Sequence, residues 1–80
     1  MKTTVIIYQR GAGYVMDYND AHGTLKQGVR VGLTPEDAAL YAARIMMRLA
    51  LDNPEGGSLM APAEVLTLVP EHLREIAPQG

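Results

Sequence analysis

The stretch that decides the fold is TPEDAALYAARIMMRLALD, residues 34–52. Thr34 is a favourable N-cap, and Pro35 suits the first helical position because its missing N–H would have no partner there. Glu36 and Asp37 place negative charge at the positive end of the helix dipole. The Asn-Pro pair at 53–54 then stops a helix. We therefore expect one long helix from residue 35 to about residue 52.

The predicted helix has two unlike faces when its residues are laid out at about 100° each. The polar stripe consists of Asp37, Tyr41, Arg44, Arg48 and Asp52. The opposite face is apolar and consists of Ala39, Ala43, Met46 and Ala50, flanked by Leu40, Ala42, Met47 and Leu49. Small alanines along its centre would let the helix lie close to a sheet. Ile45 and Leu51 are left at the edges of the polar stripe, and the C-terminal segment or a partner must cover them.

Three strands are predicted before this helix. Residues 3–9 and 14–18 are rich in β-branched and aromatic side chains, and the Gly-Ala-Gly sequence at 11–13 suits a hairpin turn between them. Residues 19–23 are a second turn cluster. Along residues 25–33 the pattern alternates. Leu25, Gln27, Val29, Val31 and Leu33 are predicted on one face, and Lys26, Gly28, Arg30 and Gly32 on the other.

After the helix the sequence predicts further extended chain. Residues 58–61 are weakly extended, residues 64–69 are a predicted strand ended by Pro70, and residues 70–76 are a predicted short helical turn. Residues 78–80 should fray. The expected fold is a single α+β domain over residues 1–80. It has a small antiparallel sheet of about four to five strands, in the order β-β-β-α-β(β), packed on one face by a single long helix.

Composition excludes several classes of protein. The chain has 80 residues and no cysteine, which rules out disulfides and thiolate metal sites. Its formal net charge of −2 argues against a direct nucleic-acid binder, which would be basic. The charge is uneven, with five of the nine acidic residues after residue 51. No apolar run approaches the roughly 20 residues of a membrane span, so we expect a soluble, cytoplasmic protein with no membrane partner.

The sequence offers no convincing catalytic, metal or cofactor site. His22 and His72 are fifty residues apart in sequence, and neither has an acidic residue four positions away or a third ligand. The Gly-x-Gly at 11–13 precedes a predicted strand rather than a helix, so it indicates a hairpin and not a dinucleotide site. Ser58 is the only serine, and the sequence gives no hint of a base beside it. We therefore predict a protein that is not an enzyme and that needs no cofactor.

Two surfaces remain as candidates for binding a protein partner. The open face of the sheet carries Lys26 and Arg30, and the polar stripe of the helix carries Tyr41, Arg44 and Arg48. An aromatic residue beside two guanidinium groups is a composition enriched in protein interfaces. For both surfaces an ordinary solvated face is the alternative interpretation.

The order of predicted elements and the closing sequence VLTLVPEHLR, residues 65–74, resemble a small phage-encoded anti-CRISPR family that acts on type I-F (Csy) systems. Members of that family have an Ala/Met-rich helix and close on a Val-Leu-x-x-(Ile/Val)-Pro-Glu-x-Leu-Arg stretch. The matching positions are Val65, Leu66, Val69, Pro70, Glu71, Leu73 and Arg74.

This resemblance implies an inhibitor that docks on a Cas subunit of a type I surveillance complex (Cascade). It would block DNA engagement or recruitment of the nuclease. Two alternatives stay open. One is a self-assembling structural protein of a phage or mobile element, which would form a homodimer or larger assembly. The other is a small nucleic-acid-binding module that contacts phosphates through its lysine and arginine side chains.

Overall fold

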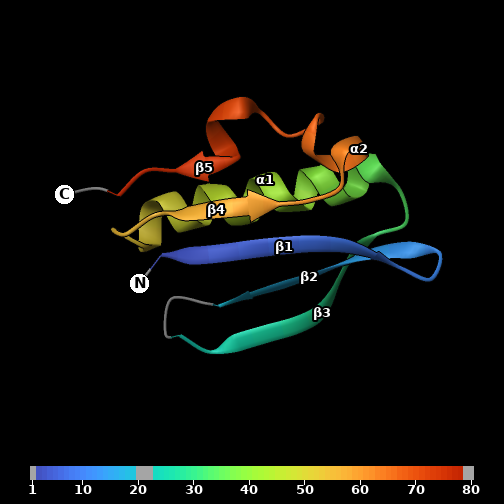
Figure 1. Cartoon of the computed structure of the whole chain (residues 1–80), viewed down its shortest axis with the longest axis horizontal. Coiled ribbons are helices and arrows are strands. Elements are labelled where there is room, and N and C mark those ends of the chain that lie inside the picture. The colour runs from blue at the N-terminus through green and yellow to red at the C-terminus, as the bar shows by residue number, and fades with distance from the viewer. Residues whose placement is uncertain (1, 20–22, 79–80) are drawn as a thin grey trace.

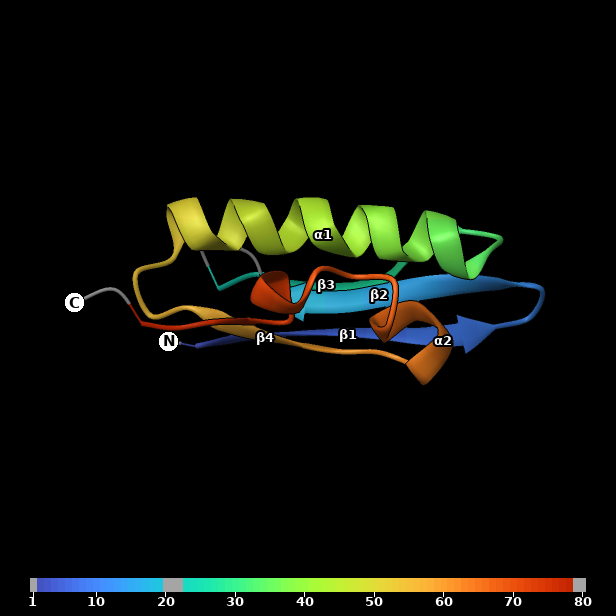
Figure 2. The same ribbon diagram turned by 90° about the horizontal axis from the view of Figure 1, so that it is seen from above.

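Five strands and one long helix form two layers, with α1 lying along one face of the sheet (Figures 1 and 2). The computed structural model describes residues 2–19 and 23–78. The elements in chain order are β1 (Thr3–Arg10), β2 (Gly13–Asn19), β3 (Leu25–Gly32), α1 (Pro35–Asp52), β4 (Gly57–Met60), α2 (Ala63–Leu66), η1 (Glu71–Leu73) and β5 (Glu75–Ile76). The predicted α+β class with one long helix is confirmed. The frayed end predicted for residues 78–80 falls mainly on residues 79–80, which lie outside the described residues, as do residues 20–22 of the second turn.

The sheet is mixed rather than antiparallel. The strand order is β3-β2-β1-β4-β5, and β1 pairs in parallel with β4, while the other three pairings are antiparallel. The prediction of an antiparallel sheet was wrong at this one pairing. The cause is the path of the chain, because α1 carries it back to the end of the sheet where β1 begins. β4 therefore starts beside the start of β1 and runs in the same direction (Figure 1).

The two ends of α1 are fixed as the sequence predicts. Thr34 Oγ1 accepts a hydrogen bond from the Asp37 N–H at 3.1 Å, which caps the first turn. At the other end the Asn53 side chain donates to Thr3 Oγ1 at 3.0 Å. This second bond ties the end of the helix to the start of β1 and satisfies the buried hydroxyl of Thr3.

The buried face of α1 differs from the predicted one. The buried residues are Ala38, Ala39, Ala42, Met46 and Leu49. Tyr41, predicted in the polar stripe, is half-buried and packs against the core, as does Ile45. Leu40 and Met47, predicted to flank the buried face, are exposed, and nothing in the described part of the chain covers Leu51. Ala38 and Ala42 are fully buried, so the small side chains that the prediction placed at Ala39 and Ala43 are replaced at the centre of the buried face by these two.

The predicted strand over residues 64–69 is also wrong. α2 begins after Pro62, and the N–H groups of Val65 and Leu66 both donate to the Pro62 carbonyl. Val65, Val69 and Leu73 are spaced four residues apart, and all three are buried side chains of this segment. Packing against α1 overrides the β propensity of these residues. The extended chain lies instead in β4, and the predicted turn at 70–76 becomes η1 followed by β5.

β3 does not alternate regularly. Its pairing with β2 shifts register at two places, between Tyr14 and Val15 and between Met16 and Tyr18. Gly28 and Gly32 have positive φ values of 65° and 141°, which only glycine adopts without strain. The predicted apolar face of residues 25–33 is consequently broken. Val31 is buried, whereas Leu25 and Leu33 are exposed.

Candidate interaction surfaces

The face of the sheet opposite α1 is one candidate surface. Alternation along β1 places Thr4, Ile6, Tyr8 and Arg10 on this face, and their neighbours on the adjacent strands are Val15, Asp17, Ser58 and Met60. None of the described elements crosses this face (Figure 2). We call it the open sheet face.

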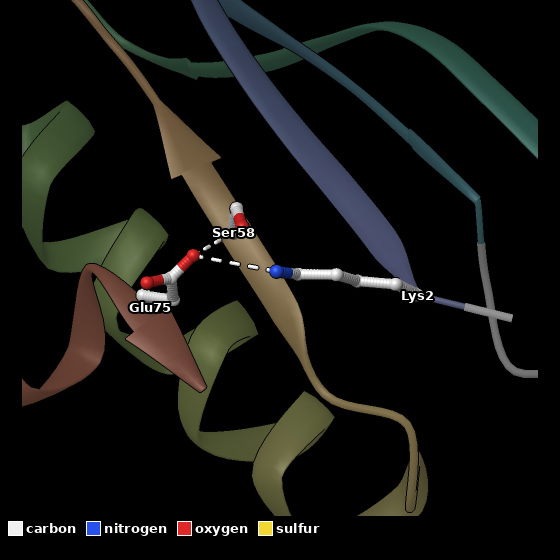
Figure 3. Close-up of polar contacts among 3 residues, drawn as sticks. All are labelled: Lys2, Ser58 and Glu75. Carbon is white, nitrogen blue, oxygen red and sulfur yellow. Dashed lines mark hydrogen bonds and ion pairs between the residues drawn. The ribbon is translucent and has the colours of Figure 1, made fainter. Parts of the chain in front are cut away.

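One end of the open sheet face is held together by a polar cluster of Lys2, Ser58 and Glu75 (Figure 3). Glu75 Oε1 accepts from the Ser58 hydroxyl at 3.1 Å and from Lys2 Nζ at 3.3 Å. The hydrogen bond from Ser58, and then the nearby Lys2 ammonium, lower the pKa of the Glu75 carboxyl below its usual 4.5. The cluster joins the start of β1 to β4 and β5. Ser58 therefore has an acceptor, the Glu75 carboxylate, that sequence reasoning did not place beside it.

The pKa of Glu75 predicts a dependence of stability on pH. A carboxyl whose pKa is lowered by folding stabilises the folded state above its unfolded value, and this contribution disappears as the pH falls through the folded pKa. We expect the free energy of unfolding of the wild-type protein to fall more steeply below pH 4.5 than that of Glu75→Gln. Urea denaturation at a series of pH values measures the difference. Parallel pH profiles for the two proteins would contradict the role assigned to the cluster.

The middle of the open sheet face carries a second polar cluster. Asp17 Oδ1 accepts from the Tyr8 hydroxyl at 3.2 Å and from the Gly28 N–H at 2.8 Å. Desolvation, together with the bond to Asp17, raises the pKa of the Tyr8 hydroxyl above its usual 10.0, and Arg10 opposes this shift. Asp17 therefore stabilises the bulge of β3 at Gly28, and its Oδ1 accepts two hydrogen bonds.

The far end of the open sheet face is a hollow of about 700 Å³ lined by Arg10 and Arg30. Its other lining residues are Gly11, Ala12, Gly13, Tyr14, Val15, Gly28, Gly32 and Leu33. Neither arginine forms an ion pair with any of the described residues. As predicted, the Gly-x-Gly sequence at 11–13 lies at a hairpin connection: Gly11 and Ala12 form the turn, and Gly13 is the first residue of β2.

The structure separates the two residues that the sequence placed together on the sheet. Lys26 pairs with Tyr18, and Arg30 pairs with Val15. Tyr18 packs against the helix-side core, whereas Val15 belongs to the open sheet face. Lys26 and Arg30 therefore lie on opposite faces, because the bulge at Gly28 inverts the alternation. The neighbour of Arg30 is Arg10, which sequence reasoning missed although it alternates with Ile6 and Tyr8 along β1.

The second candidate surface is the outward side of α1. Leu40, Met47 and Leu51 are 57%, 55% and 87% exposed and surround Arg44. We call these four residues the α1 row. Arg44 forms no ion pair with a described residue, while the neighbouring Arg48 pairs with Asp52 at 3.6 Å. Their spacing of four, three and four residues places all four on one side of the helix. Of the predicted contact residues on α1, Arg44 and Arg48 face solvent and Tyr41 turns toward the core.

A shallow groove continues the α1 row toward the C-terminal segment. It measures about 390 Å³ and is lined by Glu36, Ala39, Leu40, Ala43, Leu68 and Pro70. Leu68 is half exposed on the connection between α2 and η1. The connection between α2 and η1 thus adds apolar surface beside Leu40 and does not cover the helix there.

The motif that carries the family resemblance is largely a packing motif. Val65, Val69 and Leu73 are buried, and Arg74 Nε donates to the Val69 carbonyl at 3.1 Å. Pro70 and Glu71 are its exposed members. The motif therefore fixes the C-terminal segment against α1, and Pro70 is the one of its matching positions that lines the groove.

The described residues contain no group of three or more His, Asp or Glu side chains arranged to hold a metal ion. His72 is exposed on η1, and His22 lies outside the described residues. No helix in residues 2–19 and 23–78 is both long and apolar enough to cross a membrane.

No protein-family model and no curated protein matches this chain. The fold and surfaces define a small α+β protein with two exposed candidate interaction surfaces.

Proposed function

We propose that this protein is a non-catalytic inhibitor that acts by binding another protein. In its specific form, it is an anti-CRISPR protein that docks on a subunit of a type I surveillance complex in the cytoplasm of the host cell. Binding there would block DNA engagement or recruitment of the nuclease. The observation that supports docking is the α1 row, with three large apolar side chains exposed around Arg44. The sequence resemblance at residues 65–74 supports the choice of target.

The chemistry of the α1 row indicates what the partner must provide. Leucine and methionine side chains gain free energy by leaving water, at about 25 cal/mol per Å² of apolar area. Arg44 would lose water in the same contact. The partner must therefore either place a carboxylate beside the Arg44 guanidinium or leave it exposed to solvent at the edge of the interface. A protein surface with a shallow apolar groove and an acidic residue near its centre meets both needs.

A matched pair of substitutions tests whether the α1 row contacts the partner. Met47→Glu places a charge in the α1 row, and Met60→Glu makes the same change on the open sheet face at nearly equal exposure, 55% against 58%. Because a buried unpaired charge is costly, we expect Met47→Glu to weaken binding to the type I-F surveillance complex by about tenfold or more. Met60→Glu should leave the affinity within about twofold, as for most surface changes outside a contact. Biolayer interferometry measures both.

Size-exclusion chromatography with light scattering precedes that comparison. Co-migration of the wild-type protein with the surveillance complex would support the inhibitor proposal and give the stoichiometry. If the wild-type protein does not co-migrate, the anti-CRISPR assignment fails. A free protein at twice the monomer mass, restored to a monomer by Met47→Glu, would show that a second copy of this chain occupies the α1 row. A larger effect of Met60→Glu would move the contact to the open sheet face.

A further inference from the structure

Two arginine side chains converge at the end of the open sheet face. Arg10 is the last residue of β1 and pairs with Gly13 on β2. The Arg10 side chain extends from β1 across β2 to β3, where its Nη1 lies 3.4 Å from the position that a Cβ on Gly28 would take. Arg30 stands two residues along β3 and faces Val15. Both side chains therefore line the same hollow over Val15, which is buried beneath them.

Neither guanidinium lies within 4 Å of a carboxylate of the described residues. Asp17 is the carboxylate on this face of β2; its Oδ1 accepts from Tyr8 and Gly28, and its single negative charge cannot balance two guanidinium groups. Two guanidinium groups brought to one hollow repel each other, so an anion between them gains attraction and also removes that repulsion. Each guanidinium is a planar fork of donors that matches phosphate oxygens in pairs.

The size and lining of the hollow define the rest of the ligand. Its volume of about 700 Å³ lies within the range of roughly 300–1,000 Å³ typical of small-molecule sites. Gly11 leaves the backbone accessible, since nothing lies within 4 Å of the position that its Cβ would take, and the exposed side chain of Leu33 provides an apolar wall. A ligand with a charged head and a flat or apolar body of nucleotide size fits these properties.

We propose that this hollow binds the phosphate group of a phosphorylated small molecule, with Arg10 and Arg30 as its two anchoring side chains. A doubly charged phosphate monoester matches two guanidinium groups better than a single carboxylate does. The site is distinct from the α1 row, because it lies on the opposite face of the sheet. It therefore stands or falls independently of the proposed inhibitor function.

The test is an NMR titration of the purified protein with adenosine 5′-monophosphate, phenyl phosphate and inorganic phosphate. Adenosine serves as the uncharged control, and succinate serves as the dicarboxylate control. We expect saturable shifts of the amide resonances of Gly11, Gly13 and Gly28 with the two phosphate monoesters. Arg10→Gln and Arg30→Gln should each weaken binding by about tenfold, as expected for loss of one charge-assisted contact.

Lys26→Gln is the matched control, since it removes one positive charge from the same strand on the other side of the sheet. It should leave the affinity within about twofold, because exposed charges at a distance are screened by salt. Three results would overturn the proposal: no saturable shift with either monoester, equal binding of adenosine or succinate, or an equal loss in Lys26→Gln. Circular dichroism of each variant verifies that the fold is retained.

Discussion

Met46→Ala is expected to leave most of the protein unfolded at room temperature. The Met46 side chain is fully buried between α1 and the sheet, in the same cluster as Met16 and Val5. Removing a buried methionine side chain costs about 2–5 kcal/mol, since the lost burial and the remaining cavity both count. A core of this size supplies roughly 3–5 kcal/mol in a domain without disulfides or metal. The loss is therefore comparable to the whole stability of the protein.

Met47→Ala is the control for this prediction. Met47 is the next residue in the same helix, yet it is more than half exposed. Its replacement should change the free energy of unfolding by no more than about 0.5 kcal/mol. Urea denaturation followed by circular dichroism at 222 nm measures both variants. Similar losses in the two would mean that α1 is rotated so that Met47 also faces the core, or that Met47 is covered by a second copy.

The contrast between Met46 and Met47 also shows which features of the helix could be predicted from the sequence and which could not. The helix itself was predictable because its caps and its length are local features, namely Thr34 with Pro35 at one end and Asn53 at the other. Which of the two methionines is buried is not a local feature. It depends on how closely Ala38 and Ala42 let the helix approach the sheet and on the position of the α2–η1 segment.

Two further errors have the same origin. The alternation over residues 25–33 suggested one continuous strand face, but Gly28 and Gly32 each introduce a shift of register. Glycine permits such a shift without requiring it, so the sequence alone does not locate a bulge. Likewise the β-branched residues at 65–69 favour a strand by propensity. Their spacing of four residues, from Val65 to Val69, suits helical packing equally well.

The candidate surfaces were predicted only in part. The exposed positions of Arg44 and Arg48 followed from helical periodicity, and their role in binding a partner stays a prediction. The sequence could not predict that Arg10 and Arg30 line the same hollow, because their positions depend on both the β1–β2 register and the bulge at Gly28. A signal for Arg10 did exist. It alternates with Ile6 and Tyr8 at the end of a strand whose inward side includes the buried residues Val5 and Ile7.

Gly56→Ala should detach the C-terminal strand from the sheet. Gly56 is buried just before β4 with φ at +78°, a conformation that costs a residue with a Cβ roughly 1–2 kcal/mol. A Cβ at this position would also overlap the carbonyl oxygen of Ile76, which is backbone and cannot rotate away. Ile76 pairs with Gly57, so β5 must move as a whole to make room. Hydrogen exchange should show faster exchange of the amides in residues 74–76, and the loss of stability should exceed 2 kcal/mol, the upper limit of roughly 1–2 kcal/mol set by the backbone conformation alone.

Gly11→Ala separates the two causes of that loss. Gly11 has a similar φ of +63°, but nothing lies within 4 Å of the position that its Cβ would take. This variant should lose only the roughly 1–2 kcal/mol of the backbone conformation and keep normal exchange in β5. If both variants lose the same stability, the contact between Gly56 and Ile76 contributes nothing, and β5 is not packed as described. If Gly56→Ala alone loses β5, the strand can pair with β4 only while position 56 carries no side chain.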